Sequence, residues 1–310
     1  MADIFLRSPY FLTITTGSHL SAKLELTIDG TLRYTIIKNA TSNRTVFEIA
    51  TLAKDYWAAH QEVLDTVALS STWYAYDAVD GGGSQLATAT VTDTGFYGYS
   101  FFSGGGSNQI IDPNDYELTN TGGSQIIYLP DNTASFAYDM NSGTATKKLI
   151  STSATTAAAT SGNYTWTIER ICNPKYTPIQ GRFINRNGVQ QDHFFFLKSV
   201  ENVTTKSDNF KRNIFNYSTS TYNDKEHQQQ TFNKNGAKAY TLNTNYMIEA
   251  YNDVMQDLLL SEYVWLYLNS DWQPVTVTKS SLLKKTSVND RLIQYTIEVQ
   301  EANDIINNVI

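Results

Sequence analysis

The sequence predicts a mainly β protein of several domains, with β-sandwich domains and one amphipathic helix packed on a C-terminal sheet, an α+β arrangement overall. Three observations lead to this prediction. Apolar and polar residues alternate over long stretches, which is typical of half-buried strands. Charged residues make up 17% of the 310 residues and aromatic residues 13%, a polar but weakly charged composition. A single stretch has the apolar spacing of an amphipathic helix.

The first sixty residues read as short strands joined by turns. Asp29-Gly30 is a turn signal between two extended segments. In the strand before it, polar Lys23, Glu25 and Thr27 alternate with a regular apolar set. That apolar set is Ala22, Leu24, Leu26 and Ile28. We therefore predict an N-terminal β-sandwich-like domain over residues 1–60.

The middle of the chain combines aromatic strand-like runs with runs of glycine. Residues 81–83 and 104–106 are all glycine, and aromatic segments precede each run. Two strands around a glycine-rich loop indicate a hairpin. We expect a β-rich middle domain with glycine-rich hairpins over residues 61–170.

The C-terminal part, residues 171–310, is expected to form an α+β platform domain. Residues 246–261 carry one apolar stripe at helical spacing, which predicts a helix that packs on a sheet. Residues 210–230 are polar, weakly patterned and long for a loop, so they predict an arm, a lid or an interface segment. The candidate interface residues are Phe210, Phe215 and Tyr217.

The sequence predicts no catalytic, cofactor-binding or metal-binding residues, and we expect a protein that is not an enzyme. The single cysteine, Cys172, excludes an internal disulfide and a cysteine-based zinc cluster. The four histidines are too far apart for a local metal pair, and no nucleophile elbow or phosphate loop occurs.

The charge and hydropathy patterns bear on partners and location. The net charge of −7 argues against nucleic-acid binding, and no apolar run is long enough for membrane insertion. An acidic residue stands where a signal peptide needs basic ones, which predicts a protein that is made and kept in a cytoplasm, or built into something assembled there.

The aromatic residues Trp73, Tyr74 and Tyr76 form a candidate binding surface. Tyrosine-rich faces can contact sugars or partner proteins, and they can equally fill the core of a sandwich. The sequence leaves both interpretations open.

Several stretches in the first fifty and the last hundred residues stand out, and none of them is catalytic. They are FLRSPY (5–10), AKLEL (22–26), FEIA (47–50), AYTLNT (239–244), LLLSEYVWL (258–266), PVTV (274–277), KKTSVNDRLIQY (284–295) and EA (301–302). Together they resemble tail and baseplate proteins of tailed bacteriophages that infect Bacteroidota.

The resemblance implies a structural role in the virion tail, near the tail tip or neck. The expected partners are other copies of the chain in a ring and other tail or baseplate proteins, with host-surface contact as a further possibility. An alternative is a receptor- or carbohydrate-binding tail adhesin, and a third is a tail-associated glycosidase or peptidase.

Overall fold

The computed structural model confirms a mainly β fold of several sheets with two α-helices. It describes residues 2–60, 66–99, 124–141, 144–158, 165–222, 224–249, 251–279, 281–284 and 293–306. The chain divides into two units. Unit 1 comprises Met1–Asn173, Arg182–Phe194 and Ala250–Ser261, and unit 2 comprises Pro174–Gly181, Phe195–Glu249 and Glu262–Ile310.

Unit 1 contains a five-stranded sheet of order β1-β7-β6-β3-β4. Its strands are β1 (Ala2–Phe5), β7 (Gln85–Phe96), β6 (Thr66–Tyr76), β3 (Ser21–Ile28) and β4 (Thr31–Asn39). The alternation read from the sequence is present in β3, because its four apolar side chains are fully buried and the polar ones between them are half-buried.

The buried face of this sheet packs against a second layer. That layer is the antiparallel pair of β2 (Phe11–Ile14) with β5 (Thr45–Glu48), together with α1 (Ala50–His60). Trp57 of α1 is buried and stacks on the Tyr97 ring, with the ring centroids 4.0 Å apart. This layering forms the core of a small sandwich.

The sheet extends beyond the predicted boundary at residue 60, because β3 pairs along its whole length with β6. The hairpin expected around residues 81–83 is present: β6 pairs with β7 across the short 3₁₀ turn η1 (Val79–Gly81). Gly81 and Gly83 have positive φ angles of 73° and 75°, which only glycine adopts readily. The second glycine run, residues 104–106, lies outside the described residues.

The rest of unit 1 contains two smaller sheets, β11-β12-β8 and β10-β9. Their strands are β8 (Ser124–Pro130), β9 (Ser135–Asn141), β10 (Thr144–Ile150), β11 (Thr156–Ala158) and β12 (Thr165–Ile171). Arg170 of β12 donates to four backbone carbonyls, those of Pro130, Thr133, Ser151 and Ala154. One planar guanidinium thus holds two loops in place.

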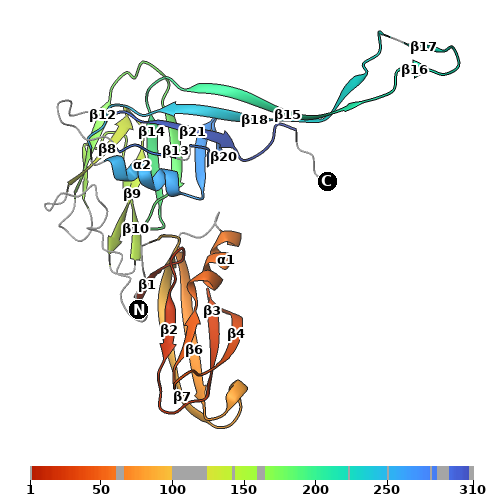
Figure 1. Ribbon diagram of the computed structural model, residues 1–310. Helices are drawn as coiled ribbons and strands as arrows, with labels where there is room; N and C mark the ends of the chain where they lie inside the picture. The colour runs from red at the N-terminus through yellow and green to blue at the C-terminus, as the bar shows by residue number, and fades with distance from the viewer. Residues whose placement is uncertain are drawn as a thin grey trace. The chain divides into compact units, whose positions relative to one another are not determined.

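Unit 2 is built on the consecutive strands β19-β20-β21-β18-β15 of one sheet (Figure 1). These are β19 (Val264–Leu268), β20 (Asp271–Val277), β21 (Thr296–Glu301), β18 (Gln229–Asn243) and β15 (Val200–Lys211). Their buried side chains include Leu242, Leu266, Ile297 and Val299. The boundary between the units falls within β13 (Ile179–Ile184) and β14 (Gln190–Phe195).

The helix predicted at 246–261 is shorter, since α2 spans Tyr251–Leu260. Met247 cannot join it because its N–H and C=O pair with the backbone of Ile293 in an isolated bridge. The apolar residues Tyr251, Val254, Met255 and Leu258 are buried as expected. The polar Asn252 and Asp257 are buried as well, and the helix belongs to unit 1. There the Tyr251 hydroxyl donates to the Ile126 carbonyl at 2.7 Å, whereas the sequence predicts packing on the C-terminal sheet.

A buried polar cluster surrounds Asp257 of α2. Its carboxylate accepts hydrogen bonds from the Tyr99 hydroxyl at 3.2 Å and from the Arg186 backbone N–H at 3.3 Å. Burial raises the pKa of the Asp257 carboxyl to about 6, and Arg186 and these hydrogen bonds only partly oppose it. In the same unit, burial lowers the pKa of His193 to about 4.

Replacing Asp257→Asn should stabilise the protein at neutral pH. Between pH 4 and 6 the Asp257 carboxyl is ionised in the unfolded state but still protonated in the folded state. The free energy of unfolding therefore falls as pH rises through this range. The shift from 3.8 to about 6 corresponds to about 3 kcal/mol at pH 7.5. An asparagine can still accept from Arg186 and donate to Tyr99. Chemical denaturation at several pH values should show the gain at pH 7.5 and its loss near pH 4.

The matched control is Asp253→Asn, which removes the same charge from a half-buried position on α2. It should change stability much less. His193 acts in the opposite direction, because stability falls as pH drops from 6.5 to about 4. The Asp257→Asn protein should therefore be more acid-sensitive than the wild type. A difference between the Asp257→Asn variant and the wild type that does not depend on pH would contradict this account.

Candidate interface: an exposed β-arm and its aromatic tip

Residues 200–243, here called the arm, form a long antiparallel ribbon of β15 and β18 (Figure 1). Pairing runs from Val200–Thr241 to Lys211–Gln229, with a bulge between Lys206 and Asp208. All twelve residues of β15 are exposed, including Val200, Val203 and Phe210. Both faces of this strand are therefore open among the described residues.

Cross-strand side-chain pairs hold the outer part of the arm together. The Phe210 and Phe232 rings meet edge to face with centroids 5.6 Å apart. On the opposite face the Thr231 hydroxyl donates to Asn209 at 2.8 Å. Such pairs contribute a few tenths to about 1 kcal/mol each, too little to replace a buried core.

The base of the arm gains a third strand-like neighbour from residues 302–306. The Ile305 N–H donates to the Gly236 carbonyl at 2.7 Å, and the Ile306 N–H donates to the Asn235 side chain at 3.1 Å. Asn235 also donates to Asp304 at 3.0 Å. From Asn235 outward, the described arm is two strands wide.

The tip of the arm, residues 212–228, contains the two-residue strands β16 (Phe215–Asn216) and β17 (Thr221–Tyr222). Two asparagines fix its turns. The Asn213 side chain accepts from the Phe215 N–H at 3.0 Å and donates to the Tyr217 hydroxyl at 3.1 Å. The Asn216 side chain accepts from the Ser218 N–H at 2.9 Å. These are the side-chain-to-backbone bonds that favour asparagine in turns.

Three aromatic residues cluster at the tip. Phe215 is half-buried because its ring contacts those of Tyr217 and Tyr222, at centroid distances of 4.9 and 5.0 Å. Tyr217 is 78% exposed and Tyr222 is 73% exposed. Large exposed aromatic residues on a supported turn are typical of contact surfaces.

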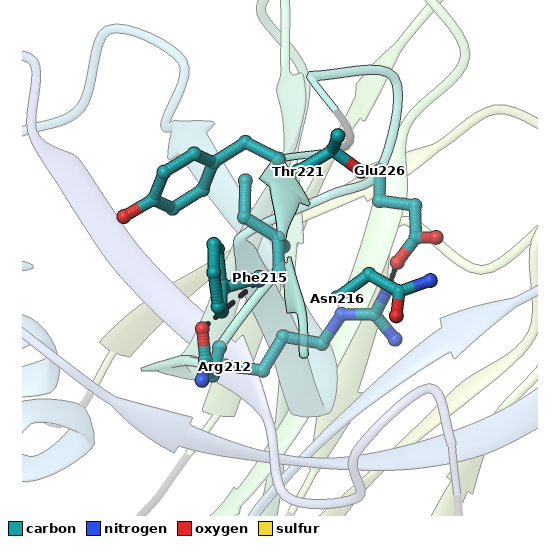
Figure 2. A pocket seen from close by; sticks show the side chains of 8 residues that line it. Arg212, Phe215, Asn216, Thr221 and Glu226 are labelled. Carbon is teal, nitrogen blue, oxygen red and sulfur yellow. Dashed lines mark hydrogen bonds and ion pairs between the residues drawn. The ribbon is translucent and has the colours of Figure 1, made fainter. Parts of the chain in front are cut away.

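A polar hollow of about 470 Å³ lies beside this cluster (Figure 2). Arg212 and Glu226 form an ion pair along it, and Asn216 and Thr221 are among the other lining residues. The hollow therefore combines a charged pair, an amide and a hydroxyl with the rings of Phe215 and Tyr222.

The structure places the predicted interface residues on one arm but not in one cluster. Phe215 and Tyr217 are in contact at the tip, whereas Phe210 packs on Phe232 in the ribbon. The sequence analysis missed Tyr222 and Phe232. The sequence does contain a signal for Tyr222: the aromatic segments 215–217 and 221–222 lie on either side of the polar residues 218–220.

The residues of the candidate aromatic surface do not share a face. Tyr74 and Tyr76 are two apart on β6, and Trp73 points to the opposite side of the sheet by strand alternation. The Tyr74 hydroxyl donates to Glu25 at 3.1 Å, and the Lys23 ammonium lies 4.2 Å from the Tyr74 ring centroid. Tyr74 is thus engaged by its own sheet.

The part of the chain that the structure describes contains no group of three His, Cys, Asp or Glu side chains able to hold a metal ion. Neither of its two helices is long and apolar enough to cross a bilayer. Comparison with family models, curated proteins and solved structures gave no match.

Asn213→Ala should loosen the tip without changing global stability. It removes two local hydrogen bonds, each worth roughly 0.5–1.5 kcal/mol, from a segment that contributes nothing to the core. Hydrogen exchange at the Phe215 amide should accelerate about tenfold while the melting temperature stays constant. Thr231→Ala, which removes one bond from the ribbon instead, should leave exchange at the tip unchanged. A lowered melting temperature in Asn213→Ala would show that the tip is part of the cooperative fold.

Proposed function

We propose that this chain is a structural subunit of a tailed-phage virion, most simply a tail or baseplate ring component at the tail tip or neck. It acts through protein–protein assembly and not as an enzyme. The observation that supports this proposal is the arm, whose strand β15 is exposed over its full length.

A ribbon of this kind gains stability when it lies on a partner. An isolated two-stranded hairpin is at best marginally stable in water, because it leaves one row of backbone groups unpaired on each edge and buries little apolar surface. The exposed rings of Tyr217, Tyr222, Phe210 and Phe232 offer anchors for such a partner. Burying these rings is the ordinary source of binding energy in interfaces.

The proposed partners are other copies of the chain in a ring and neighbouring tail or baseplate proteins. The resemblance of the chain's first fifty and last hundred residues to tail and baseplate proteins supports this choice. The proposal includes assembly in the host cytoplasm, a location in the virion tail, and no binding of nucleic acid or insertion into membranes.

A second candidate is a carbohydrate-binding tail adhesin that contacts the host surface. The observation in its favour is the hollow at the tip, where two aromatic rings adjoin Arg212, Asn216 and Glu226. Sugars are bound by stacking on aromatic rings and by hydrogen bonds to such polar groups. Glycan-array binding that disappears in Tyr222→Ala would favour this candidate over a purely structural role.

Phe215→Asp should yield a folded subunit that fails to enter particles. The ring is half-buried only by its neighbours at the tip, so the charge disrupts the aromatic cluster and leaves the core intact. We expect an unchanged melting temperature for the purified protein. In particles purified after complementation with this variant, quantitative mass spectrometry should show at least a tenfold loss of the chain.

The matched control is Leu149→Asp, which places the same charge at another exposed apolar residue, far from the arm in sequence. It should enter particles normally. In a cryo-EM map of wild-type particles the chain should occupy a symmetric ring of the tail. Its absence from purified particles would refute the proposed function.

A further inference from the structure

The two outer strands of the five-stranded sheet in unit 1 have free edges of different character. On one side, β4 has no described neighbour beyond it. On the other side, the short β1 pairs only with Asp93–Phe96 of β7. Residues 85–92 of β7 therefore have no described strand on their outer side, and six of these eight residues are exposed.

The β4 edge carries charged side chains that fold over the sheet. The Arg33 guanidinium lies 5.1 Å from the Tyr56 ring centroid. The Lys38 ammonium donates to the Val46 carbonyl at 3.1 Å and lies 5.4 Å from the Phe47 ring centroid. Inward-leaning charges on an edge strand prevent another strand from adding to it. This edge is protected.

Among the described residues, the β7 edge has no such protection. After a bulge next to Tyr76, residues 87–92 read Ala-Thr-Ala-Thr-Val-Thr, without a charge, a proline or a glycine. A regular six-residue segment of this kind favours pairing with a further strand. The Phe96 carbonyl accepts from the Leu6 N–H, so the backbone groups of Phe96 point toward the β1 side. Every second residue of a strand points its N–H to the same side, so the N–H groups of Thr88, Thr90 and Thr92 point to the free edge.

A second free edge on the same chain belongs to β15. The Gly236 carbonyl of β18 accepts from Ile305, on the side away from β15. Its partner Thr205 therefore presents its own N–H and C=O to the outer edge of the arm. β15 is the last described strand of its sheet and all twelve of its residues are exposed, so no described segment covers this edge.

The charges of the two regions are complementary. Unit 1 contains 19 acidic and 11 basic residues, a net charge of −8, and residues 200–243 contain four acidic and six basic residues, a net charge of +2. Attraction between the arm and unit 1 of another copy favours their encounter, while two copies of unit 1 repel each other.

We propose that the free edge of β7 accepts β15 from the arm of a second copy of this chain, as an added strand. Backbone hydrogen bonds supply the pairing, as in other cases of strand addition. The inference rests on the proposed function as an assembly subunit and names the partner of the arm. Because the donor and acceptor edges differ, each copy can accept one neighbour and donate to another, which generates a ring or a filament.

Three threonine-to-proline variants of the full chain test this inference. Thr90→Pro removes an outward N–H from β7, and Thr205→Pro removes one from β15. Thr35→Pro is the matched control on β4. The Ala40 N–H points inward, because it donates to the Leu20 carbonyl. Thr35 lies five residues earlier, an odd number, so its N–H points outward. In each case the proline leaves the ladder within the sheet intact. Sedimentation velocity over a range of concentrations measures self-association, and circular dichroism verifies folding.

We expect the wild-type protein and Thr35→Pro to form species larger than dimers. Thr90→Pro and Thr205→Pro should each associate at least tenfold more weakly. An equimolar mixture of these two variants should form a dimer and stop there, because the arm of the Thr90→Pro protein still fits the intact β7 of the Thr205→Pro protein. Hydrogen exchange should show protection at residues 87–92 and 200–211 on association, and none at 31–39.

If Thr90→Pro fails to fold, Ala89→Lys on β7 replaces it. Ala89 is exposed, so a lysine there blocks the edge without being buried. If Thr205→Pro fails to fold, Val203→Pro on β15 replaces it. The inference is overturned by a monomeric wild-type protein, by a Thr90→Pro protein that associates normally, or by a mixture that stays monomeric. Each of these results leaves the proposed function standing if the chain is found in particles. Its absence from particles refutes that function even if the purified chains associate.

Discussion

An open β-sheet leaves backbone N–H and C=O groups unpaired along its two outer strands, and these groups must meet water, a covering segment or another chain. In unit 1, the charged side chains of Arg33 and Lys38 on β4 lean toward Tyr56 and the Val46 carbonyl, which disfavours the addition of a strand at that edge. In unit 2, the segment that contains Ile305 pairs with the inner part of β18. The outer edges of β7 and β15 are two long edges that no described segment covers. Both inferences about assembly start from these edges.

Stability and docking depend on different residues. Polar side chains that are half-buried or buried fix unit 1: the half-buried Arg170 donates to four carbonyls, and the buried Asp257 accepts from Tyr99 and Arg186. Arg182 adds a two-point ion pair with Asp192, at 2.7 and 3.1 Å. From Asn235 outward, none of the described residues of the arm is buried. Changes on its surface can therefore alter assembly while the units remain folded.

The sequence pattern predicted strands well where one face is buried and poorly where context decides. The period-two alternation of β3 reports a buried face directly. The apolar stripe continues through Met247, so the sequence pattern starts the helix too early. Met247 is extended because it pairs with Ile293, a residue distant in sequence that the local pattern does not include. Trp73 was grouped with Tyr74 by proximity, although adjacent strand residues face opposite sides. None of the described residues among 210–230 is buried, so this stretch gives no periodic signal beyond its unusual length and polarity.

Strand addition by itself specifies register weakly, because backbone hydrogen bonds are the same at every residue. The alternating threonines of β7 sharpen this problem: a shift by two residues places Thr88 where Thr90 was and leaves the pattern unchanged. A fixed register then needs a contact outside the ladder. The aromatic tip, with Tyr217 and Tyr222 exposed around Phe215, is held at a set distance along the same ribbon as β15. In the proposed assembly, the backbone of β15 would provide affinity and the side chains of the tip would select one register.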